Sequence, residues 1–218
     1  MSSSLLVAEN LRFDSRLALY HEADKWLAVA DLHYGYELSQ RASGALFPNW
    51  GMAKIEQRIT SLISAYSPQT VLFLGDLVHT AVAATPFAHW IKRLGNTHQI
   101  VLLRGNHDRQ LRGLPLHDAW RIESAVFHHG DRPVHIGKEE TIFSGHLHPA
   151  YLVSDGAGFQ QKLPALCRTS FGWILPAFSP WAAGGNPVNQ VITTRWASNG
   201  TKIWKINASL TRNLHLLS

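Results

Sequence analysis

Five short apolar runs in this chain each end in a group of Asp, Asn or His side chains, which are the types that bind metals and transfer protons. Ligands of open α/β sheets collect at the carboxyl ends of strands, so a strand followed by such a group is a candidate site. Because five of these endings occur in order, we expect one site assembled from neighbouring strands. The five groups are Asp31-Leu-His33, Gly75-Asp76, Arg104-Gly-Asn-His-Asp108, His128-His-Gly-Asp131 and Gly145-His-Leu-His148.

Seven side chains in these groups are candidate metal ligands. Residues i and i+2 of a strand share a face, so Asp31 with His33, and His146 with His148, could each reach one ion. Imidazole, carboxylate and amide donors without a thiolate suit Mn, Fe or Zn. One divalent ion rarely takes seven such ligands, whereas two ions can share them if one carboxylate bridges. The seven are Asp31, His33, Asp76, Asn106, His129, His146 and His148.

A pair of divalent ions predicts a particular chemistry. Two metals about 3.5–4 Å apart are the usual arrangement for hydrolytic displacement at phosphorus, because they hold the attacking and leaving oxygens and lower the pKa of a water. The sequence therefore predicts a phosphate ester hydrolase with two divalent metal ions as cofactors. Mn²⁺ is the favoured ion, with Fe or Zn as alternatives.

His107 has a separate assignment from the ligands. It follows Asn106 directly, so strand alternation directs it away from the ion that Asn106 would bind. It is the candidate general acid for the leaving oxygen, a role typically contributing about 10²–10⁴-fold to the rate. Asp108 is the candidate that orients His107 by hydrogen bonding. The alternative is a histidine that supports the ligands without touching substrate.

Other residues near the motifs leave choices open. His129 is favoured over His128 as the ligand, because it directly precedes a glycine and because His128 should point to the other side of its strand. His79 follows the second group closely, but an ordinary loop histidine is the favoured interpretation. Trp181 could stack on a nucleic-acid base, although a packing role is favoured.

The elements that would position these groups alternate between strand and helix in the first part of the chain. Helical spacing of apolar residues predicts a helix over 52–66 and a second over 86–94, with Thr85 as the N-cap of the latter. After residue 120, closely spaced runs predict mostly antiparallel strands. No low-complexity linker or repeat divides the chain, so one domain over residues 1–218 is expected. The expected strands cover 17–21, 26–30, 71–74, 100–103, 125–127, 141–143, 151–153, 163–169, 172–175 and 201–206.

Composition narrows the class of protein. Of 218 residues, 45% are hydrophobic and only 16% are charged, which argues against disorder. The net charge of +5 favours anionic partners weakly, since no dense Lys/Arg block is present. Cys167 is the single cysteine, so no internal disulfide can form. Without a leader pattern or an apolar run of about 18 residues, a soluble cytoplasmic protein with no membrane partner is expected.

The ordered motifs D-x-H, G-D, G-N-H-D, H-G and G-H-x-H, over residues 31–148, resemble those of the calcineurin-like metallophosphoesterase superfamily. The resemblance implies an α/β fold, specifically a four-layer α/β/β/α sandwich with two mixed β-sheets, around a dinuclear centre. It also implies that Asp76 bridges the two ions and that His107 protonates the leaving group. The other implied ligands are Asp31, His33 and His148 at one ion and Asn106, His129 and His146 at the second.

A narrower resemblance extends to about residue 190. It rests on Ala30-Asp-Leu-His-Tyr-Gly-Tyr-Glu37, Gly145-His-Leu-His-Pro149, Lys162-Leu-Pro-Ala-Leu, Leu175-Pro-Ala-Phe178 and Gly184-Gly185, which are similar to the bacterial DNA ligase-associated metallophosphoesterases. That family implies a phosphodiesterase or nuclease linked to DNA repair, with a DNA ligase and a helicase as partners. The chain departs from it at Ser179-Pro-Trp181, where Gly and an aromatic residue are expected near the first position.

The leading functional hypothesis is a metal-dependent phosphoesterase whose substrate is a phosphate ester, with nucleic acid as a candidate. Alternatives within this class are a small cyclic or dinucleotide phosphodiesterase, a phosphomonoesterase and a protein phosphatase. A non-enzymatic alternative is a scaffold that keeps its metals for folding and docks onto repair partners. His107 argues against a scaffold, because a scaffold needs no proton donor.

Overall fold

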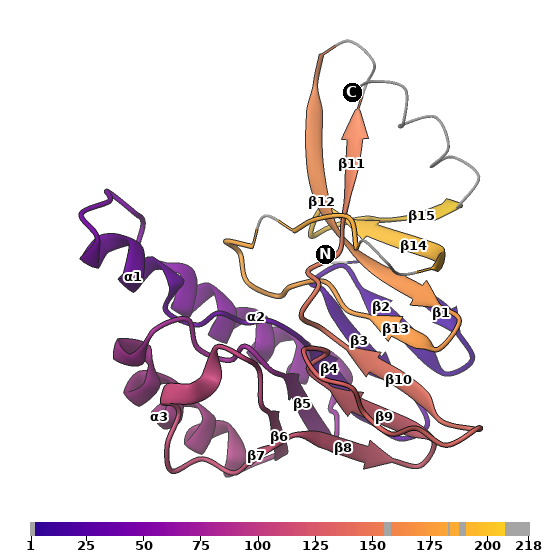
Figure 1. The fold of residues 1–218 in the computed structure, drawn as a ribbon, viewed down its shortest axis with the longest axis horizontal. Helices are drawn as coiled ribbons and strands as arrows, with labels where there is room; N and C mark the ends of the chain where they lie inside the picture. The colour runs from indigo at the N-terminus through magenta and orange to yellow at the C-terminus, as the bar shows by residue number, and fades with distance from the viewer. Residues whose placement is uncertain (1–2, 155–157, 183, 188–190, 208–218) are drawn as a thin grey trace.

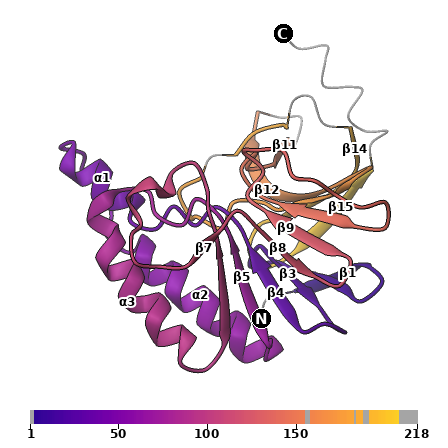
Figure 2. The same ribbon diagram turned by 60° about the horizontal axis from the view of Figure 1, so that its bottom comes forward.

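The computed structural model describes residues 3–154, 158–182, 184–187 and 191–207. Two β-sheets face each other, and two of the helices cover the outer face of the first sheet (Figure 1, Figure 2). The helices are α1 (Tyr36–Ala42), α2 (Gly51–Tyr66) and α3 (Ala84–Gly95), accompanied by the 3-10 turns η1 (Ala81–Ala83) and η2 (Asp108–Gln110).

The first sheet has seven strands, and each pairs with the next in the chain. The first three pairings are antiparallel and the last three are parallel, so the sheet is mixed. Its strands are β1 (Ser4–Ala8), β2 (Leu11–Asp14), β3 (Ala18–His21), β4 (Trp26–Val29), β5 (Thr70–Leu74), β6 (Gln99–Leu103) and β7 (Leu116–His117).

The second sheet comprises β8 (Ala119–Ile122), β9 (Ala125–His128), β10 (Thr141–Ser144), β11 (Ala150–Ser154), β12 (Gln160–Thr169), β13 (Gly172–Ile174), β14 (Ile192–Ser198) and β15 (Ile203–Asn207). Its order is β15-β14-β12-β13-β10-β9-β8, and β11 pairs with β12. Strand β10 is parallel to both β9 and β13, while the other pairings are antiparallel.

A shared hydrophobic core holds the layers together. Every residue of β4 and β5 is buried, as expected for parallel strands covered on both faces. On one face, α2 contributes the fully buried Ile55 and Ile59. On the other, the Trp26 ring packs edge-on against Phe127 and Phe143 of the second sheet, with centroids 4.9 and 5.1 Å apart. The carboxyl ends of β4, β5 and β6 are thereby fixed along one edge.

The expected α/β class with two mixed sheets is confirmed. Of the four expected layers, the described residues form three, because their three α-helices all precede residue 96 and none covers the outer face of the second sheet. The prediction of mostly antiparallel strands after residue 120 is confirmed, and the exceptions are the parallel pairings of β10 with β9 and with β13. Their connections are long enough to return the chain to a parallel register, which the spacing of apolar runs alone does not reveal.

The helix predictions are confirmed, with one correction at a cap. Thr85 is not the N-cap of α3, since the helix begins at Ala84 directly after the η1 turn. The capping side chain lies upstream, where Thr80 accepts a hydrogen bond from the Val82 backbone N–H at 3.4 Å. None of the helices that the described residues form has the length and apolar character needed to cross a bilayer.

Candidate metal centre

The loops that follow β4 and β5 stay side by side beyond the ends of the strands. The Asp31 N–H donates to the Gly75 carbonyl at 3.2 Å, and the His33 N–H donates to the Asp76 carbonyl at 2.8 Å. On the second sheet, the Gly145 N–H donates to the His129 carbonyl at 2.8 Å. Backbone hydrogen bonds therefore extend the two sheets into two pairs of adjoining loops that carry the candidate ligands.

Five candidate ligands adopt left-handed backbone conformations rather than strand conformations. Non-glycine residues in this region are uncommon and concentrate at functional sites. Strand alternation is therefore the wrong explanation for how the D-x-H and H-x-H pairs are placed. Asp31 and His33 do share a cluster, whereas His146 and His148 lie in different clusters. The five φ values are 55° at Asp31, 42° at His33, 48° at Asp76, 67° at His146 and 43° at His148.

The first cluster consists of Asp31, His33, Asp76 and His148, whose potential ligand atoms all lie within 4.8 Å of one another. The Nε2 atom of His148 is 3.3 Å from both Asp31 Oδ1 and His33 Nε2. Asp76 Oδ2 lies 3.7 Å from His33 Nε2. Two imidazoles and two carboxylates thus converge from both sheets on one small volume.

The second cluster consists of Asp76, His129 and His146. His129 Nε2 lies 3.4 Å from Asp76 Oδ1 and 3.1 Å from His146 Nδ1, and Asn106 Oδ1 adjoins it at 3.2 Å. On the other side of the ring, His129 Nδ1 is 2.8 Å from the Leu74 carbonyl oxygen. A carbonyl only accepts, so Nδ1 carries the proton and Nε2 keeps a free lone pair directed at the cluster.

Two glycines allow this close packing. A Cβ on Gly75 would lie 2.4 Å from His129 Nδ1, and its φ of +79° also favours glycine. A Cβ on Gly105 would lie 2.2 Å from both the backbone nitrogen and Oδ1 of Asp76. Any larger residue at either position would displace a candidate ligand.

The burial and charge of the centre fit divalent cations. Asp31 and Asp76 are 0% and 2% exposed, and within the described parts of the chain their ion pairs involve histidines and no Lys or Arg. Buried carboxylates without cationic partners are costly unless they bind metal. Burial lowers the pKa of His33 to about 3, against the opposing charge of Asp76, so its imidazole is neutral and can donate a lone pair.

The sequence profile of the calcineurin-like phosphoesterase family matches residues 25–161, which are more than half of the chain and include all seven candidate ligands. The chain belongs to the calcineurin-like phosphoesterase family. It is therefore a metal-dependent hydrolase of phosphate esters. The family assignment and the clustered Asp and His side chains agree on a site for divalent metals.

The fold is shared with a solved structure. This calcineurin-like phosphoesterase is similar to the nuclease MPE of Pseudomonas putida, with a TM-score of 0.73, 23% identity, and coverage of 94% of this chain and 100% of that one. A second match is Yfce, a phosphoesterase from E. coli, with a TM-score of 0.47, 16% identity, and coverage of 84% of this chain and 98% of that one. None of the curated proteins matches this chain.

His107 of this phosphoesterase lies at the rim of the centre. Its ring centroid is 5.4 Å from that of His33, and its side chain is exposed. Its backbone N–H donates to Asp76 Oδ1 at 3.0 Å, which ties the His107 loop to the carboxylate between the clusters. The His107 loop is thus anchored through its backbone, while the exposed ring lies beside the first cluster.

Asp108 does not orient the His107 ring in the way its sequence position suggests. Its buried carboxylate accepts backbone hydrogen bonds instead, from Leu77 at 2.8 Å and Val78 at 3.2 Å on Oδ1, and from Gly105 at 2.8 Å on Oδ2. Burial raises the pKa of Asp108 to about 6. The Asp108 carboxylate therefore joins the loop after β5 to the loop after β6 by hydrogen bonds. It influences the position of His107 only through the backbone of that loop.

His79 is a site residue that sequence reasoning underrated. Its ring centroid lies 5.6 Å from His33, 5.9 Å from His107 and 4.7 Å from Tyr36. Its Nδ1 atom is buried without a hydrogen-bond partner among the described residues. The available signal was its position three residues after Asp76, but that spacing alone does not distinguish a site histidine from a loop histidine.

Proposed function

We propose that this phosphoesterase is a dinuclear enzyme that hydrolyses phosphodiester bonds of nucleic acid. The observation that carries the dinuclear part is the position of Asp76, whose Oδ2 faces His33 while its Oδ1 faces His129. One carboxylate with an oxygen toward each of two clusters is suited to serve two ions at once. This supports Asp76 as the shared ligand.

In this proposal the remaining ligands divide between the two ions. Mn²⁺ is the proposed metal, with Fe or Zn as alternatives, because nitrogen and oxygen donors without thiolate suit these ions. When bound, the ions lower the pKa of a water and stabilise negative charge on the phosphoryl oxygens. Asp31, His33 and His148 complete the first set, and Asn106, His129 and His146 complete the second.

The chain's own contribution to bond cleavage centres on His107. Its exposed ring beside the first cluster is positioned to give a proton to the leaving oxygen. Asp108 holds the loop that presents this ring, through its three backbone contacts. We therefore assign His107 as the general acid and Asp108 as a positioning residue.

Nucleic acid is the proposed substrate. The net charge of +5 favours a polyanion, and the fold is shared with a protein described as a nuclease. The narrower resemblance to DNA ligase-associated metallophosphoesterases favours a cytoplasmic role in DNA repair with ligase and helicase partners. Because one hydrophobic core joins both sheets, we also propose that residues 1–218 form a single domain.

Metal analysis and a small diester test the proposal. After EDTA treatment and reloading with Mn²⁺, we expect two ions per chain by elemental analysis and hydrolysis of bis-p-nitrophenyl phosphate that EDTA abolishes. Cleavage of DNA should then exceed cleavage of cyclic dinucleotides and phosphomonoesters. One ion per chain would overturn the dinuclear assignment, and a preference for cyclic dinucleotides or monoesters would overturn the nucleic-acid assignment.

A further inference from the structure

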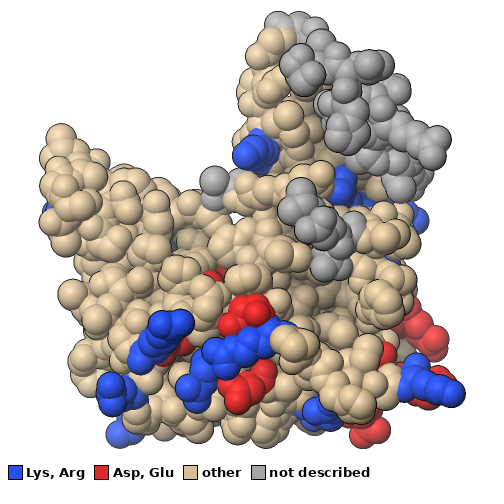
Figure 3. Space-filling view, viewed as in Figure 1, with Lys and Arg blue, Asp and Glu red and all other residues tan. Residues whose placement is uncertain are grey.

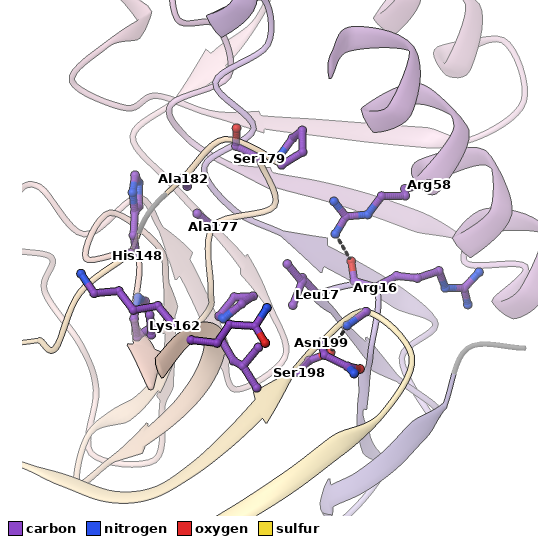
Figure 4. Close-up of a pocket in the computed structure, with 18 of the residues that line it drawn as sticks. Arg16, Leu17, Arg58, His148, Lys162, Ala177, Ser179, Ala182, Ser198 and Asn199 are labelled. Carbon is purple, nitrogen blue, oxygen red and sulfur yellow. Dashed lines mark hydrogen bonds between the residues drawn. The ribbon is translucent and has the colours of Figure 1, made fainter. Parts of the chain in front are cut away.

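A cleft of about 580 Å³ opens beside the first cluster (Figure 4). Its volume lies within the range of about 300–1,000 Å³ typical of ligand sites. In Figure 4, His148 and Lys162 form one wall and Arg58 the opposite wall, with Ser179 at one end and Asn199 at the other. The cleft is thus bounded by α2, by β12 and by the segments that follow β13 and β14.

The cleft adjoins the metal centre at His148. His148, a member of the first cluster, lines it directly. The Ser179 N–H donates to the Asp31 carbonyl at 3.1 Å, and Ala177 forms a parallel bridge with Ala30. A molecule bound in the cleft therefore extends from the first cluster along a wall that is bonded to the Asp31 backbone.

The described lining residues carry positive charge and include no Asp or Glu. Arg16 is neutralised by Asp14 at 2.7 Å, and its guanidinium points away from the cleft (Figure 4). Lys54 and Lys162 are exposed and have no ion pair within the described ranges. On the face drawn in Figure 3, the acidic side chains lie in the lower half, and the charged side chains coloured in the upper part are Lys and Arg.

Arg58 supplies the most desolvated of these cations. Its guanidinium lies 4.2 Å from the Phe178 ring centroid and donates to the carbonyls of Phe178 and Arg16, both at 2.9 Å. It has no carboxylate partner among the described residues. Burial lowers the pKa of Arg58 to about 10, which reflects the cost of this unpaired charge. An anion in the cleft would provide the partner that the fold omits.

Aromatic rings border the cleft next to Pro180 and Ala182 of its lining. The ring of Trp181 packs against that of Trp50, which is 44% exposed, with centroids 4.4 Å apart and planes tilted by 35°. The Lys54 ammonium lies 5.3 Å from the Trp50 ring centroid. The buried Glu37 accepts hydrogen bonds from the Trp181 indole N–H at 3.3 Å and from the Met52 N–H at 2.7 Å. Glu37 thus fixes the aromatic platform to the start of α2.

We propose that this cationic cleft and its Trp50–Trp181 platform bind a single strand of nucleic acid and lead it to the metal centre. This inference rests on the proposed function. Proteins that bind single strands combine a positively charged groove with aromatic rings on which bases stack. Cations on both walls and a separate aromatic platform offer more contacts than one phosphate can use, which favours a strand over a mononucleotide.

Binding is measured without metal, so that it does not depend on catalysis. The probe is a fluorescein-labelled oligothymidylate of about 12 nucleotides, followed by anisotropy in EDTA over a range of KCl concentrations. For Lys162→Ala and Lys54→Ala we expect weaker binding, and a slope of log K against log[KCl] reduced by about 0.7 for each lost phosphate contact. Lys92→Ala, an exposed charge on α3 outside the cleft, is the matched control and should retain the wild-type slope.

The platform has its own pair of variants. Trp50→Ala should weaken oligothymidylate binding at least about fivefold, the lower end of the loss of one base stack. Trp204→Ala removes a tryptophan of similar exposure, 43%, from β15 and should leave binding unchanged. Thermal melts of all variants show that each remains folded.

Three results would overturn the proposal that the cleft binds a single strand. The first is an equal change in the slope of log K against log[KCl] in Lys162→Ala and Lys92→Ala, and the second is an equal loss of affinity in Trp50→Ala and Trp204→Ala. The third is a dinucleotide that binds as tightly as the longer strand. Tighter binding of a duplex, unaffected by Lys162→Ala, would also overturn it. If the wild-type protein shows no metal-dependent hydrolysis of a diester, that result would count against the proposed function but not against binding in the cleft. The two failures are therefore distinguishable.

Discussion

The metal centre and the cationic cleft share His148 but are held in place by different means. The centre is buried, and several of its candidate ligands have left-handed backbone conformations. The ligands pack so closely that there is no room for a side chain at Gly105. The cleft is lined by long exposed side chains such as Lys54 and Lys162. Chemistry at the centre should therefore tolerate almost no substitution, whereas substrate preference at the cleft should change gradually.

Asp76→Ala tests the rigid half of this comparison most severely. Loss of the carboxylate between the clusters should reduce metal-dependent turnover by at least about 1,000-fold, because even an outer-shell partner of a metal ligand is worth about 10–100-fold. Elemental analysis should show fewer than two ions per chain. Full activity in this variant would contradict a shared ligand and remove the basis of the dinuclear proposal.

His107→Ala should have the next largest effect, and it should depend on the leaving group. Esters with alkoxide leaving groups should lose about 100-fold or more in turnover, because a general acid contributes about 10²–10⁴-fold. The p-nitrophenyl ester should lose much less, since its leaving group needs no proton. Metal content should stay at two ions, and His98→Ala at the surface serves as the control. Equal losses on both esters would contradict the assignment.

Gly105→Ala separates close packing from ligand chemistry. The added Cβ must push against the Asp76 nitrogen and Oδ1, which should lower the free energy of unfolding by about 1–3 kcal/mol and reduce Mn²⁺ binding. Gly95→Ala is the matched control, because a Cβ there meets nothing within 4 Å. Urea unfolding of both variants in EDTA measures the difference. Equal stability of the two variants would show that the loop after β6 can relax.

Asp14→Asn tests the wall of the cleft and should have the smallest effect on activity. Burial tends to raise the pKa of Asp14, but hydrogen bonds from Arg16 and Tyr66 outweigh it and lower the pKa. We expect Asp14→Asn to lower the free energy of unfolding by about 1.5–3 kcal/mol at pH 7, the usual contribution of hydrogen bonds to a charged group.

The pH dependence gives this prediction its sign. Because the folded pKa of Asp14 is depressed, its contribution is complete above the unfolded value of about 3.9 and is lost as the pH falls through the folded value. Melts in EDTA at falling pH should therefore bring the wild type and Asp14→Asn closer together. Asp118→Asn, whose side chain is 77% exposed, should follow the wild type throughout. A constant gap down to the lowest pH would contradict the lowered pKa.

The sequence predicted the parallel strand ends well because local pattern and burial agree there. Val71–Leu74 and Ile100–Leu103 are apolar on every residue, which is the pattern of parallel strands covered on both faces, and the polar residues that follow lie at the sheet edge. The second sheet was harder to predict. Its pairings between β9, β10 and β13 depend on connections that bring distant segments together, which a local pattern does not encode.

Contacts between distant segments were also beyond the reach of the sequence. Glu37 lies in the same motif as Asp31 and His33, yet its partners are the start of α2 and Trp181, far along the chain. A Cβ on Gly51 would lie 2.3 Å from the Trp181 indole nitrogen, so three separate segments define this one contact. No spacing rule in the sequence relates these three segments, so the Trp50–Trp181 platform is recognised only in the folded chain.

The left-handed ligands carry a consequence for the lifetime of the protein. Such conformations cost about 1–2 kcal/mol per residue, and in the metal-free chain only the surrounding loops oppose that cost. Ions that bind the folded state alone would stabilise it by about 2.7 kcal/mol at a concentration 100-fold above Kd. Metal supply would then govern how often the loops after β4, β5 and β10 open, so that metal-starved molecules expose these segments to proteases first.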